Sequence, residues 1–389
     1  MDPIIAQIQA IAQNSDEAGR LNIIQSLRRV RIELQSPKDT FMELAVPGLT
    51  NAMLRISADL GILRTLARTG VSLTVAQLEE LTGASPSLLE RILRYLAATD
   101  MIKETGVNEY TANSITYALA GSEGDAMIYY GFDTIGPVVQ AMPAFFVANN
   151  YQDVTVNTNT PFQKAHNTEL TSFEWLVQQP KHFENMQRIM TALQGSEWTE
   201  GFDIFNDEAR NIPFKPSSTA PKPSEKPFFV DVGGGHGHQC IELGKKHPNL
   251  LGHLVLQDLP EAVEHLPPIN GVRAEAYDFF QPQPIIGAKF YYLRRIIHDW
   301  PDDRAAKILG NVRAAMSPDS RVLIDDAVLP DTGANWQSAV ADLAMMTFGG
   351  KERTKHQWES LAESAGLRVE QIHTYVASTY TAVLVLATK

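Results

Sequence analysis

A cluster of glycines directly after a short apolar strand constrains the fold of this chain more than any other feature. The run DVGGGHGH at 231–238 follows the apolar residues FFV and precedes a segment with helical spacing of apolar side chains. Glycine permits a tight turn and lets a ligand approach the backbone without meeting side chains. The run therefore predicts a strand, a ligand-binding turn and a helix, with these candidate binding residues: Gly233, Gly234, Gly235 and Gly237.

The spacing of acids downstream of this turn indicates which ligand it serves. A glycine-rich turn alone would equally open a dinucleotide site. The second predicted strand ends at Asp258, 25 residues after Gly233, where a carboxylate can accept both hydroxyls of a ribose. The third predicted strand ends at Asp278 and Phe279, an acid beside an aromatic ring that suits adenine. The pattern therefore favours an adenosine-containing ligand.

Short β runs alternate with helical segments from residue 228 onward. This alternation predicts a Rossmann-like, doubly wound α/β domain over 228–389, with a mainly parallel sheet and a final antiparallel hairpin. The preceding stretch is rich in proline and serine, which predicts a surface loop at 211–227. A chain of 389 residues is long enough for at least two domains.

A winged-helix pattern lies between residues 74 and 113. It consists of a capped helix, a second apolar helix and a two-stranded wing turning at Gly106. Winged helices often bind DNA, but the second helix offers only Arg91 and Arg94, and the chain carries a net charge of −12. We therefore expect no nucleic-acid partner.

Apolar faces in the same region favour a protein partner instead. Helical periodicity gives wide apolar faces at 85–96 and along 4–34, which are too hydrophobic to remain in water. Residues 1–120 are therefore expected to form a mainly helical dimerisation domain that pairs with a second copy in a homodimer.

Cysteine and apolar content predict the environment of the protein. The single cysteine, Cys240, excludes an intrachain disulfide, so a cytoplasmic location is the simplest expectation. The apolar runs are far shorter than a membrane span needs, so we expect no membrane partner. His236 and His238 resemble metal ligands, but no third ligand stands at a suitable spacing, and we expect no metal.

A series of spaced motifs gives the second half of the chain a family resemblance. In chain order these motifs are DVGGGHGH, LVLQDLP, YDFFQPQP, YYLRRIIHDWPDD, RVLIDDAVLP and DLAMMTFGGKERTKHQW. The series is similar to that of the S-adenosylmethionine (SAM) dependent O-methyltransferases of the plant caffeate and fungal secondary-metabolite kind. The N-terminal domain looks like the dimerisation domain of that family.

The resemblance implies a cofactor and the residues that bind it. It implies that the glycine turn and Asp258, with the adjoining Leu259, hold the methionine and ribose parts of SAM. It further implies that Asp278 and Phe279 hold the adenine, and that Arg294 stands where plant members have a lysine near the cofactor.

Methionine and aromatic residues at helical spacing between 121 and 210 suit the second substrate. Most such side chains fill a core, but they can also line an adaptable apolar pocket. We expect a helical connector over 121–210 that lines the site of a small-molecule acceptor. The expected pocket residues, from this connector and from the later domain, are Phe132, Met142, Phe173, Trp175, Met190, Asp299 and Met346.

His298 is the candidate catalytic base. It follows the fourth predicted strand, at the edge where open α/β sheets bind ligands. An imidazole with a pKa of about 6.5 is mostly neutral at pH 7 and can take a proton from a phenol or enol. In the family two acids steady this imidazole, and the resemblance places them at Asp326 and Glu352. Asp326 is shorter than the glutamate of most relatives, and its neighbour Asp325 is an alternative.

Two reactions are compatible with these residues. The first is SAM-dependent O-methylation of a hydroxyl on an apolar aromatic or polyketide-derived small molecule in secondary metabolism, with His298 as general base. The alternative is a pericyclase or dehydratase in which SAM is a fixed positive charge and is not consumed. His298 favours methyl transfer. The shortened acid at 326 and the pair Arg294–Arg295, of which only one can face the site if both lie on a strand, keep the alternative open.

Overall fold

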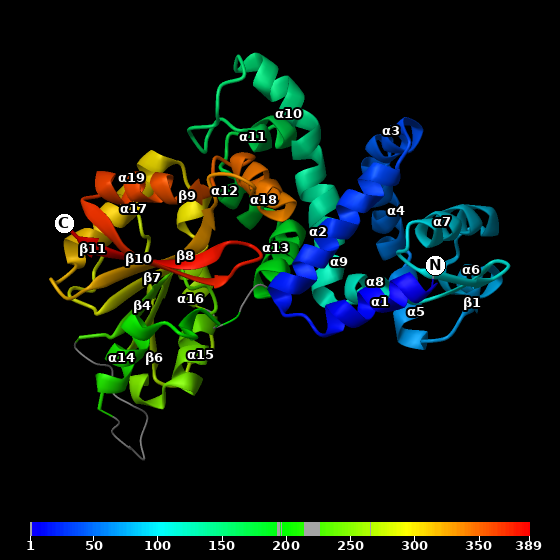
Figure 1. Cartoon of the computed structure of the whole chain (residues 1–389). Coiled ribbons are helices and arrows are strands. Elements are labelled where there is room, and N and C mark those ends of the chain that lie inside the picture. Colours follow the sequence, from blue (N-terminus) through cyan, green and yellow to red (C-terminus); the bar gives the residue numbers. More distant parts are fainter. Residues whose placement is uncertain (1, 193–194, 196, 214–225, 265) are drawn as a thin grey trace. The chain divides into compact units, whose positions relative to one another are not determined.

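The computed structural model describes residues 2–192, 195, 197–213, 226–264 and 266–389, and these form two compact units (Figure 1). Unit 1 contains the described residues within 1–12, 22–147 and 161–193. Unit 2 contains those within 13–21, 148–160 and 194–389. Most of the loop expected at 211–227 lies outside the described residues.

Residues 2–120 are helical apart from a small antiparallel sheet. The helices are α1 (Asp2–Gln13), α2 (Glu17–Leu34), α3 (Pro37–Ala45), α4 (Pro47–Asp59), α5 (Ile62–Thr69), α6 (Val75–Thr82), α7 (Pro86–Ala98) and α8 (Ser114–Ala120). The strands β1 (Leu73–Thr74), β2 (Lys103–Gly106) and β3 (Glu109–Thr111) pair in the order β1-β3-β2. The wing turns at Val107 and Asn108 instead of Gly106, because Gly106 still pairs with Glu109 and Asn108 adopts the left-handed conformation (φ 55°).

The apolar face of α7 packs inside its own unit, so the expectation that residues 85–96 present a free face to a partner is wrong. Its Leu89, Ile92, Leu93 and Leu96 are buried in a core shared with α5 and α6. Helical periodicity identified the apolar face correctly, but it does not tell whether that face packs against the same chain or another one.

The exposed apolar surface lies on α1, α2 and α3 instead. None of the 18 residues of α2 is buried. Large apolar side chains on these three helices are open to solvent, namely Ile4, Ile5, Ile11, Ile24, Leu27, Val30, Ile32, Leu34, Phe41, Met42 and Leu44. We call these eleven side chains the N-terminal apolar surface.

A helical stretch follows between residues 122 and 211. Its elements are α9 (Ser122–Tyr129), the π-helix η1 (Tyr130–Ile135), α10 (Gly136–Ala148), α11 (Pro161–His166), α12 (Ser172–Val177), α13 (Pro180–Ala192), η2 (Glu197–Thr199) and α14 (Asp203–Asn211). The stretch spans both units, because η2 and α14 belong to unit 2.

Unit 2 is built on a mixed sheet, which confirms the predicted doubly wound α/β fold. The strands are β4 (Phe229–Val232), β5 (Leu254–Asp258), β6 (Val272–Ala276), β7 (Phe290–Arg294), β8 (Arg321–Leu329), β10 (Leu367–Val376) and β11 (Thr381–Thr388). Their order is β10-β11-β8-β7-β4-β5-β6, and the short β9 (Arg353–Thr354) pairs with β8. Strands β4 to β8 run parallel, while β11 is antiparallel to both β8 and β10, which is the predicted final hairpin.

Helices cover both faces of this sheet (Figure 1). Along β4, Val230 and Val232 join the core formed with α17 (Asp302–Ala315) and α19 (Lys355–Ser364), whereas Phe229 joins the core formed with α14 and α15 (His238–Lys246). The remaining elements are α16 (Pro260–Val263), α18 (Trp336–Met346), η3 (Pro248–Leu250) and η4 (Ile297–Asp299). The sheet order reverses at β4, so a ligand crevice is expected outside the carboxyl ends of β4 and its neighbours. No described helix has the length and apolar character to cross a membrane.

Candidate active site

The glycine turn joins β4 to α15 and leaves an open cradle at its centre. Gly233, Gly235 and Gly237 have φ values of 74°, 55° and 76°. A Cβ on Gly233 would lie 2.6 Å from Ile296 Cδ1, and one on Gly237 would lie 2.7 Å from Ile269 Cδ1. No heavy atom lies within 4 Å of a Cβ placed on Gly235. The outer two glycines are therefore required by packing, and Gly235 opens onto space for a ligand.

Asp258 ends β5 as predicted and points at this turn. Its Oδ2 accepts a hydrogen bond from Gly235 N at 2.7 Å, and its Oδ1 accepts one from Leu259 N at 2.7 Å. Burial raises the pKa of Asp258, and these two hydrogen bonds oppose that shift. A carboxylate offers about four acceptor positions, so both oxygens can still accept hydroxyl groups from a ligand.

The acid and aromatic pair lies two residues beyond the strand predicted to end with it. Strand β6 ends at Ala276, and Asp278 Oδ1 accepts a hydrogen bond from Phe280 N at 2.9 Å. The partly buried Phe279 packs edge-on against Phe280 and Trp300, at centroid distances of 5.0 and 6.0 Å. The pair follows β6 as expected, but on a turn.

Arg294 is the last residue of β7 and belongs to a buried network with Asp325. Its Nη1 donates to Gly195 O at 2.6 Å and lies 3.6 Å from Asp325 Oδ2. Asp325 also accepts hydrogen bonds from Tyr292 at 2.5 Å and from Tyr375 at 2.7 Å. Burial disfavours the charge of Arg294, but Tyr292 and Asp325 raise its pKa above the usual value.

Arg295 does not continue the strand as expected. It follows β7 in the left-handed conformation, with φ of 52°. The two arginines are therefore separated by a change of backbone direction, not by the alternation of a strand.

His298 lies in η4, which follows β7, and three carboxylates surround its imidazole. Its Nδ1 is 2.9 Å from Glu352 Oε1 and 3.8 Å from Asp326 Oδ1, and its Nε2 is 3.5 Å from Asp299 Oδ1. The imidazole and the first two acids are buried, with 7%, 5% and 2% exposure for His298, Glu352 and Asp326. Of the two alternatives left open by the sequence, Asp326 therefore faces His298, and Asp325 faces the arginine.

Several oxygens of this cluster have no hydrogen-bond partner among the described residues. They are both carboxylate oxygens of Asp326 and Oε2 of Glu352. Buried acceptors of this kind are costly when unpaired, so they are expected to act on a charge or to accept a proton.

The surrounding acids favour the protonated form of the His298 imidazole, whereas the neutral form was expected from the sequence. Burial lowers the pKa of His298, but the charges of Asp326 and Asp299 and the hydrogen bond to Glu352 outweigh it and raise the pKa to about 10. Burial in turn raises the pKa of Asp326 to about 7 and that of Asp299 to about 6, while the imidazolium opposes both shifts. At pH 7 the isolated protein therefore holds His298 protonated, unlike the neutral imidazole expected from an ordinary pKa.

The predicted pocket residues fall into both units. Phe132, Met142, Phe173, Trp175 and Met190 belong to unit 1, whereas Asp299 and Met346 belong to unit 2. In unit 1, Trp175 packs against Phe162, His166 and His182, at centroid distances of 5.4, 4.3 and 5.0 Å. In unit 2, Asp299 lies beside the imidazole of His298, as described above.

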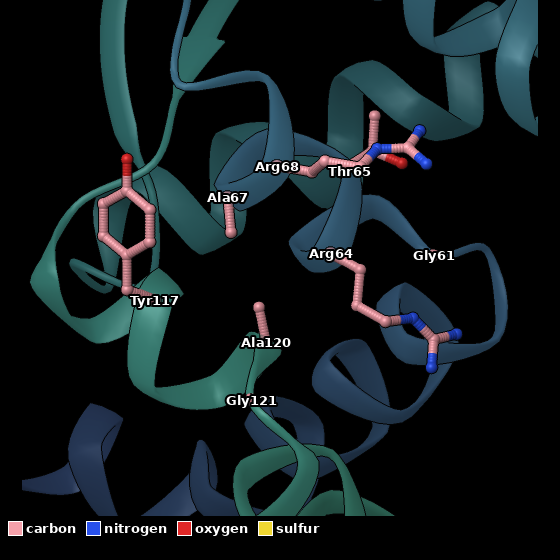
Figure 2. A pocket seen from close by; sticks show the side chains of 8 residues that line it. All are labelled: Gly61, Arg64, Thr65, Ala67, Arg68, Tyr117, Ala120 and Gly121. Atoms are coloured by element: carbon pink, nitrogen blue, oxygen red, sulfur yellow. The ribbon is translucent and has the colours of Figure 1, made fainter.

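Unit 1 also contains a cavity of about 640 Å³ formed by α5 and α8 (Figure 2). Its lining residues are Gly61, Arg64, Thr65, Ala67, Arg68, Tyr117, Ala120 and Gly121. None of the predicted site residues lines this cavity, so it does not belong to the candidate active site.

Two buried charged residues beside the site were missed by reasoning from sequence. Asp231, the acid that opens the glycine run, is 1% exposed, and burial followed by the charge of Asp258 raises its pKa to about 7. Arg353, next to Glu352 in GGKERT, is fully buried. The sequence did offer a signal for each residue, because Asp231 opens the glycine run and Arg353 directly follows Glu352. In the described part of the chain, no group of three or more His, Cys, Asp or Glu side chains is arranged so that it could hold a metal ion, and Cys240 is buried.

Comparison with known proteins identifies the family of this chain. Residues 220–368 match the model of the O-methyltransferase domain, and residues 42–120 match that of the O-methyltransferase dimerisation domain. The demethylsterigmatocystin 6-O-methyltransferase of Aspergillus flavus is 40% identical over 376 residues, which cover 96% of this chain and 95% of the relative.

Solved structures agree with this comparison over the full length. LepI in complex with SAM superposes with a TM-score of 0.91 at 35% identity, covering 100% of this chain and 98% of LepI. A structure described as a pericyclic reaction enzyme gives a TM-score of 0.90 at 34% identity, covering 100% of this chain and 99% of that chain.

Proposed function

This chain belongs to the O-methyltransferase family and uses SAM, and from that premise we propose that it methylates a hydroxyl of an apolar aromatic or polyketide-derived small molecule in secondary metabolism. The observation that carries the proposal is the imidazole of His298, held by Glu352 at 2.9 Å on the side of Nδ1. This contact leaves Nε2 as the atom that can exchange a proton with an acceptor hydroxyl.

The residues at the carboxyl edge of the sheet fit SAM. The space above Gly235 admits a ligand against the backbone, and the oxygens of Asp258 can accept the ribose hydroxyls. Asp278 and Phe279 would bind the adenine, and Arg294 would lie near the cofactor. When bound, SAM supplies a methyl group carried on a positively charged sulfur.

His298 would remove the proton of the acceptor. The hydroxyl proton would move to Nε2, and the acceptor oxygen would use the freed electron pair to bond to the methyl carbon while the bond from that carbon to sulfur breaks and the sulfur keeps its electron pair. The imidazolium that results is stabilised by Glu352 and Asp326, which is the electrostatic role of the two acids. Asp299, 3.5 Å from Nε2, would help to orient the hydroxyl.

Partly exposed apolar side chains support an apolar acceptor. Phe132, Phe173 and Met190 are 38%, 40% and 45% exposed, although they lie on helices whose other apolar residues form a core. The name of the 40% identical relative specifies a hydroxyl-bearing small molecule by its 6-O position, which supports the same acceptor class.

A pericyclase or dehydratase is the second candidate, and the protonation of His298 favours it. An imidazole with a pKa of about 10 is a proton donor at neutral pH, as the loss of water requires. The 34% identity to a pericyclic reaction enzyme over the whole chain supports this candidate as well.

We further propose that the protein is a homodimer in the cytoplasm, without nucleic-acid or membrane partners. The match to a dimerisation domain supports association of two copies. The N-terminal apolar surface, with Leu34 at 81% and Leu44 at 75% exposure, is the part of the chain that a second copy would cover.

Release of S-adenosylhomocysteine tests the reaction. The full-length protein is incubated with SAM and a panel of phenolic and enolic polyketide-type acceptors, and product masses are followed together with S-adenosylhomocysteine. We expect one molecule of S-adenosylhomocysteine to be formed for each methylated product. In His298→Ala we expect turnover to fall by about 10²–10⁴-fold, with the affinity for SAM, measured by calorimetry, unchanged. Full conversion of the true acceptor without S-adenosylhomocysteine would contradict methyl transfer and support the second candidate.

A further inference from the structure

Arg353 is a fully buried arginine whose guanidinium binds mostly to backbone carbonyls. Its Nε and Nη2 donate to Asp302 Oδ1 at 2.9 and 2.7 Å, but the side chain of Asp302 is 61% exposed. Nη2 also donates to Trp300 O at 2.9 Å, and Nη1 donates to Ile297 O at 3.2 Å and to Lys351 O at 3.3 Å. Burying a guanidinium is costly, so this set of bonds indicates a specific purpose.

The carbonyls that Arg353 binds flank the residues of the candidate site. Ile297 directly precedes His298, and Lys351 directly precedes Glu352. The same two segments meet in a second contact, in which Lys351 N donates to His298 O at 2.7 Å. They approach so closely that a Cβ on Gly350 would lie 2.5 Å from His298 O.

Arg353 also reaches the segment that carries Asp326. Its guanidinium carbon lies 5.2 Å from the centre of the Trp358 ring. The indole of Trp358 donates to Ala327 O at 2.9 Å, and Ala327 follows Asp326. One side chain therefore connects the three segments that bring the imidazole and its two acids together.

We propose that Arg353 is a positioning residue that makes Glu352, and not another acid, the hydrogen-bond partner of His298 Nδ1. This inference rests on the proposed role of His298. Glu352 Oε1 lies 2.9 Å from Nδ1 and Asp326 Oδ1 lies 3.8 Å from the same nitrogen, so a shift of about 1 Å between the segments would exchange the partner. With Glu352 fixed at Nδ1, Nε2 stays directed at the acceptor.

The test measures the hydrogen bonding and the titration of the His298 imidazole directly. The full-length protein is labelled with ¹⁵N-histidine, and the signal of His298 is assigned by its loss in His298→Ala. In Arg353→Met we expect the hydrogen-bonded Nδ1 proton signal to disappear and the pKa of His298 to change by about one pH unit or more. In Arg353→Lys, whose ammonium can still bind two of the carbonyls, we expect an intermediate result.

Two further variants separate positioning from general loss of stability. Tyr291→Phe removes a buried hydroxyl that binds Ile285 O and Ala315 O in the same core, and we expect it to lower the melting temperature without changing the titration of His298. If Arg353→Met does not fold, the titration of His298 is measured in Arg353→Lys and Asp302→Asn instead, because both variants weaken the same contacts more gently. A wild-type titration in the folded Arg353 variants, or the same change in Tyr291→Phe, would overturn the proposal.

Turnover provides a second readout. For an acceptor that the wild-type protein methylates, we expect Arg353→Met to lower kcat by about 10–100-fold and to displace its pH profile, with little change in the KM for SAM. The nuclear magnetic resonance titration needs no turnover, so failure of this inference and failure of the methyltransferase proposal give different results.

Discussion

Replacing Asp326 by asparagine should return His298 toward an ordinary histidine. The two carboxylate oxygens of Asp326 make no hydrogen bond with described residues, so the isosteric amide breaks none. It does remove a charge 3.8 Å from Nδ1. At that distance, with an effective dielectric constant of about 20, the pair interacts by about 4 kcal/mol, which is about three powers of ten in proton affinity. The pKa of His298 is therefore expected to fall from about 10 toward its usual value.

The same substitution should alter how stability depends on pH. Burial raises the pKa of Asp326 to about 7 in the folded protein, from an ordinary value of 3.8. A group whose pKa is raised by folding stabilises the fold fully below its unfolded pKa, and this contribution is lost as the pH rises through the folded pKa. The wild-type protein therefore loses up to about 4 kcal/mol between pH 4 and 7 through this acid, and Asp326→Asn should not.

Two measurements check these expectations. The titration of His298 is followed by ¹⁵N nuclear magnetic resonance, and the free energy of unfolding is measured in urea at pH 5, 6, 7 and 8. Asp325→Asn is the matched control, because Asp325 binds Tyr292 and Tyr375 and does not contact the imidazole. An unchanged titration in Asp326→Asn, or an equal change in Asp325→Asn, would refute the assignment of the charge effect to Asp326.

Three further predictions concern the cofactor and the partner. Asp258→Ala should weaken SAM binding by about 10- to 100-fold in calorimetry, because a charged acceptor of about 1.5–3 kcal/mol is lost, and equal affinity would contradict its role. Gly235→Asn should fold, since no heavy atom lies within 4 Å of the new Cβ and asparagine tolerates the left-handed conformation of Gly235 (φ 55°), but it should lose SAM binding; retained binding would show that the cradle is not the site. Leu27→Asp should shift the mass in light scattering from dimer to monomer, whereas Val107→Asp, at a position 95% exposed on the wing, should not; equal masses for both would place the interface elsewhere.

Local pattern was sufficient to predict the α/β fold and the ends of its main strands. The glycine run, Asp258 at the end of β5 and His298 after β7 depend on strand, turn and helix signals that lie within a few residues of each other. The third strand was extended two residues too far, because the pairing of β6 with β5 ends at Ala276, before Asp278. Signals from residues close together in the sequence thus identify the ligand-binding edge of the sheet, but they place the ends of its strands only to within one or two residues.

Local sequence patterns could not predict contacts between segments that are distant in the sequence. The face of α7 was recognised as apolar, but only the folded unit shows that Leu89 and Leu93 pack within it. The choice between Asp325 and Asp326 depends on which face of β8 each one occupies, and adjacent residues of a strand take opposite faces. The hydrogen bonds of Arg353 join residues 2 to 56 positions away, so the sequence shows the residue but not its role.

The direction of the pH dependence distinguishes the two candidate reactions. Methyl transfer requires His298 to begin neutral, because the imidazole must accept the hydroxyl proton. Its pKa of about 10 in the protein without ligands then predicts a kcat/KM that rises with pH throughout the range from 7 to 9. Dehydration requires the imidazole to begin protonated, so its kcat/KM should stay level over that range and fall only as His298 loses its proton. Measuring kcat/KM for the native acceptor from pH 6 to 10 therefore decides whether His298 accepts a proton in the reaction or donates one. A kcat/KM that falls from pH 7 upward would exclude His298 as the general base.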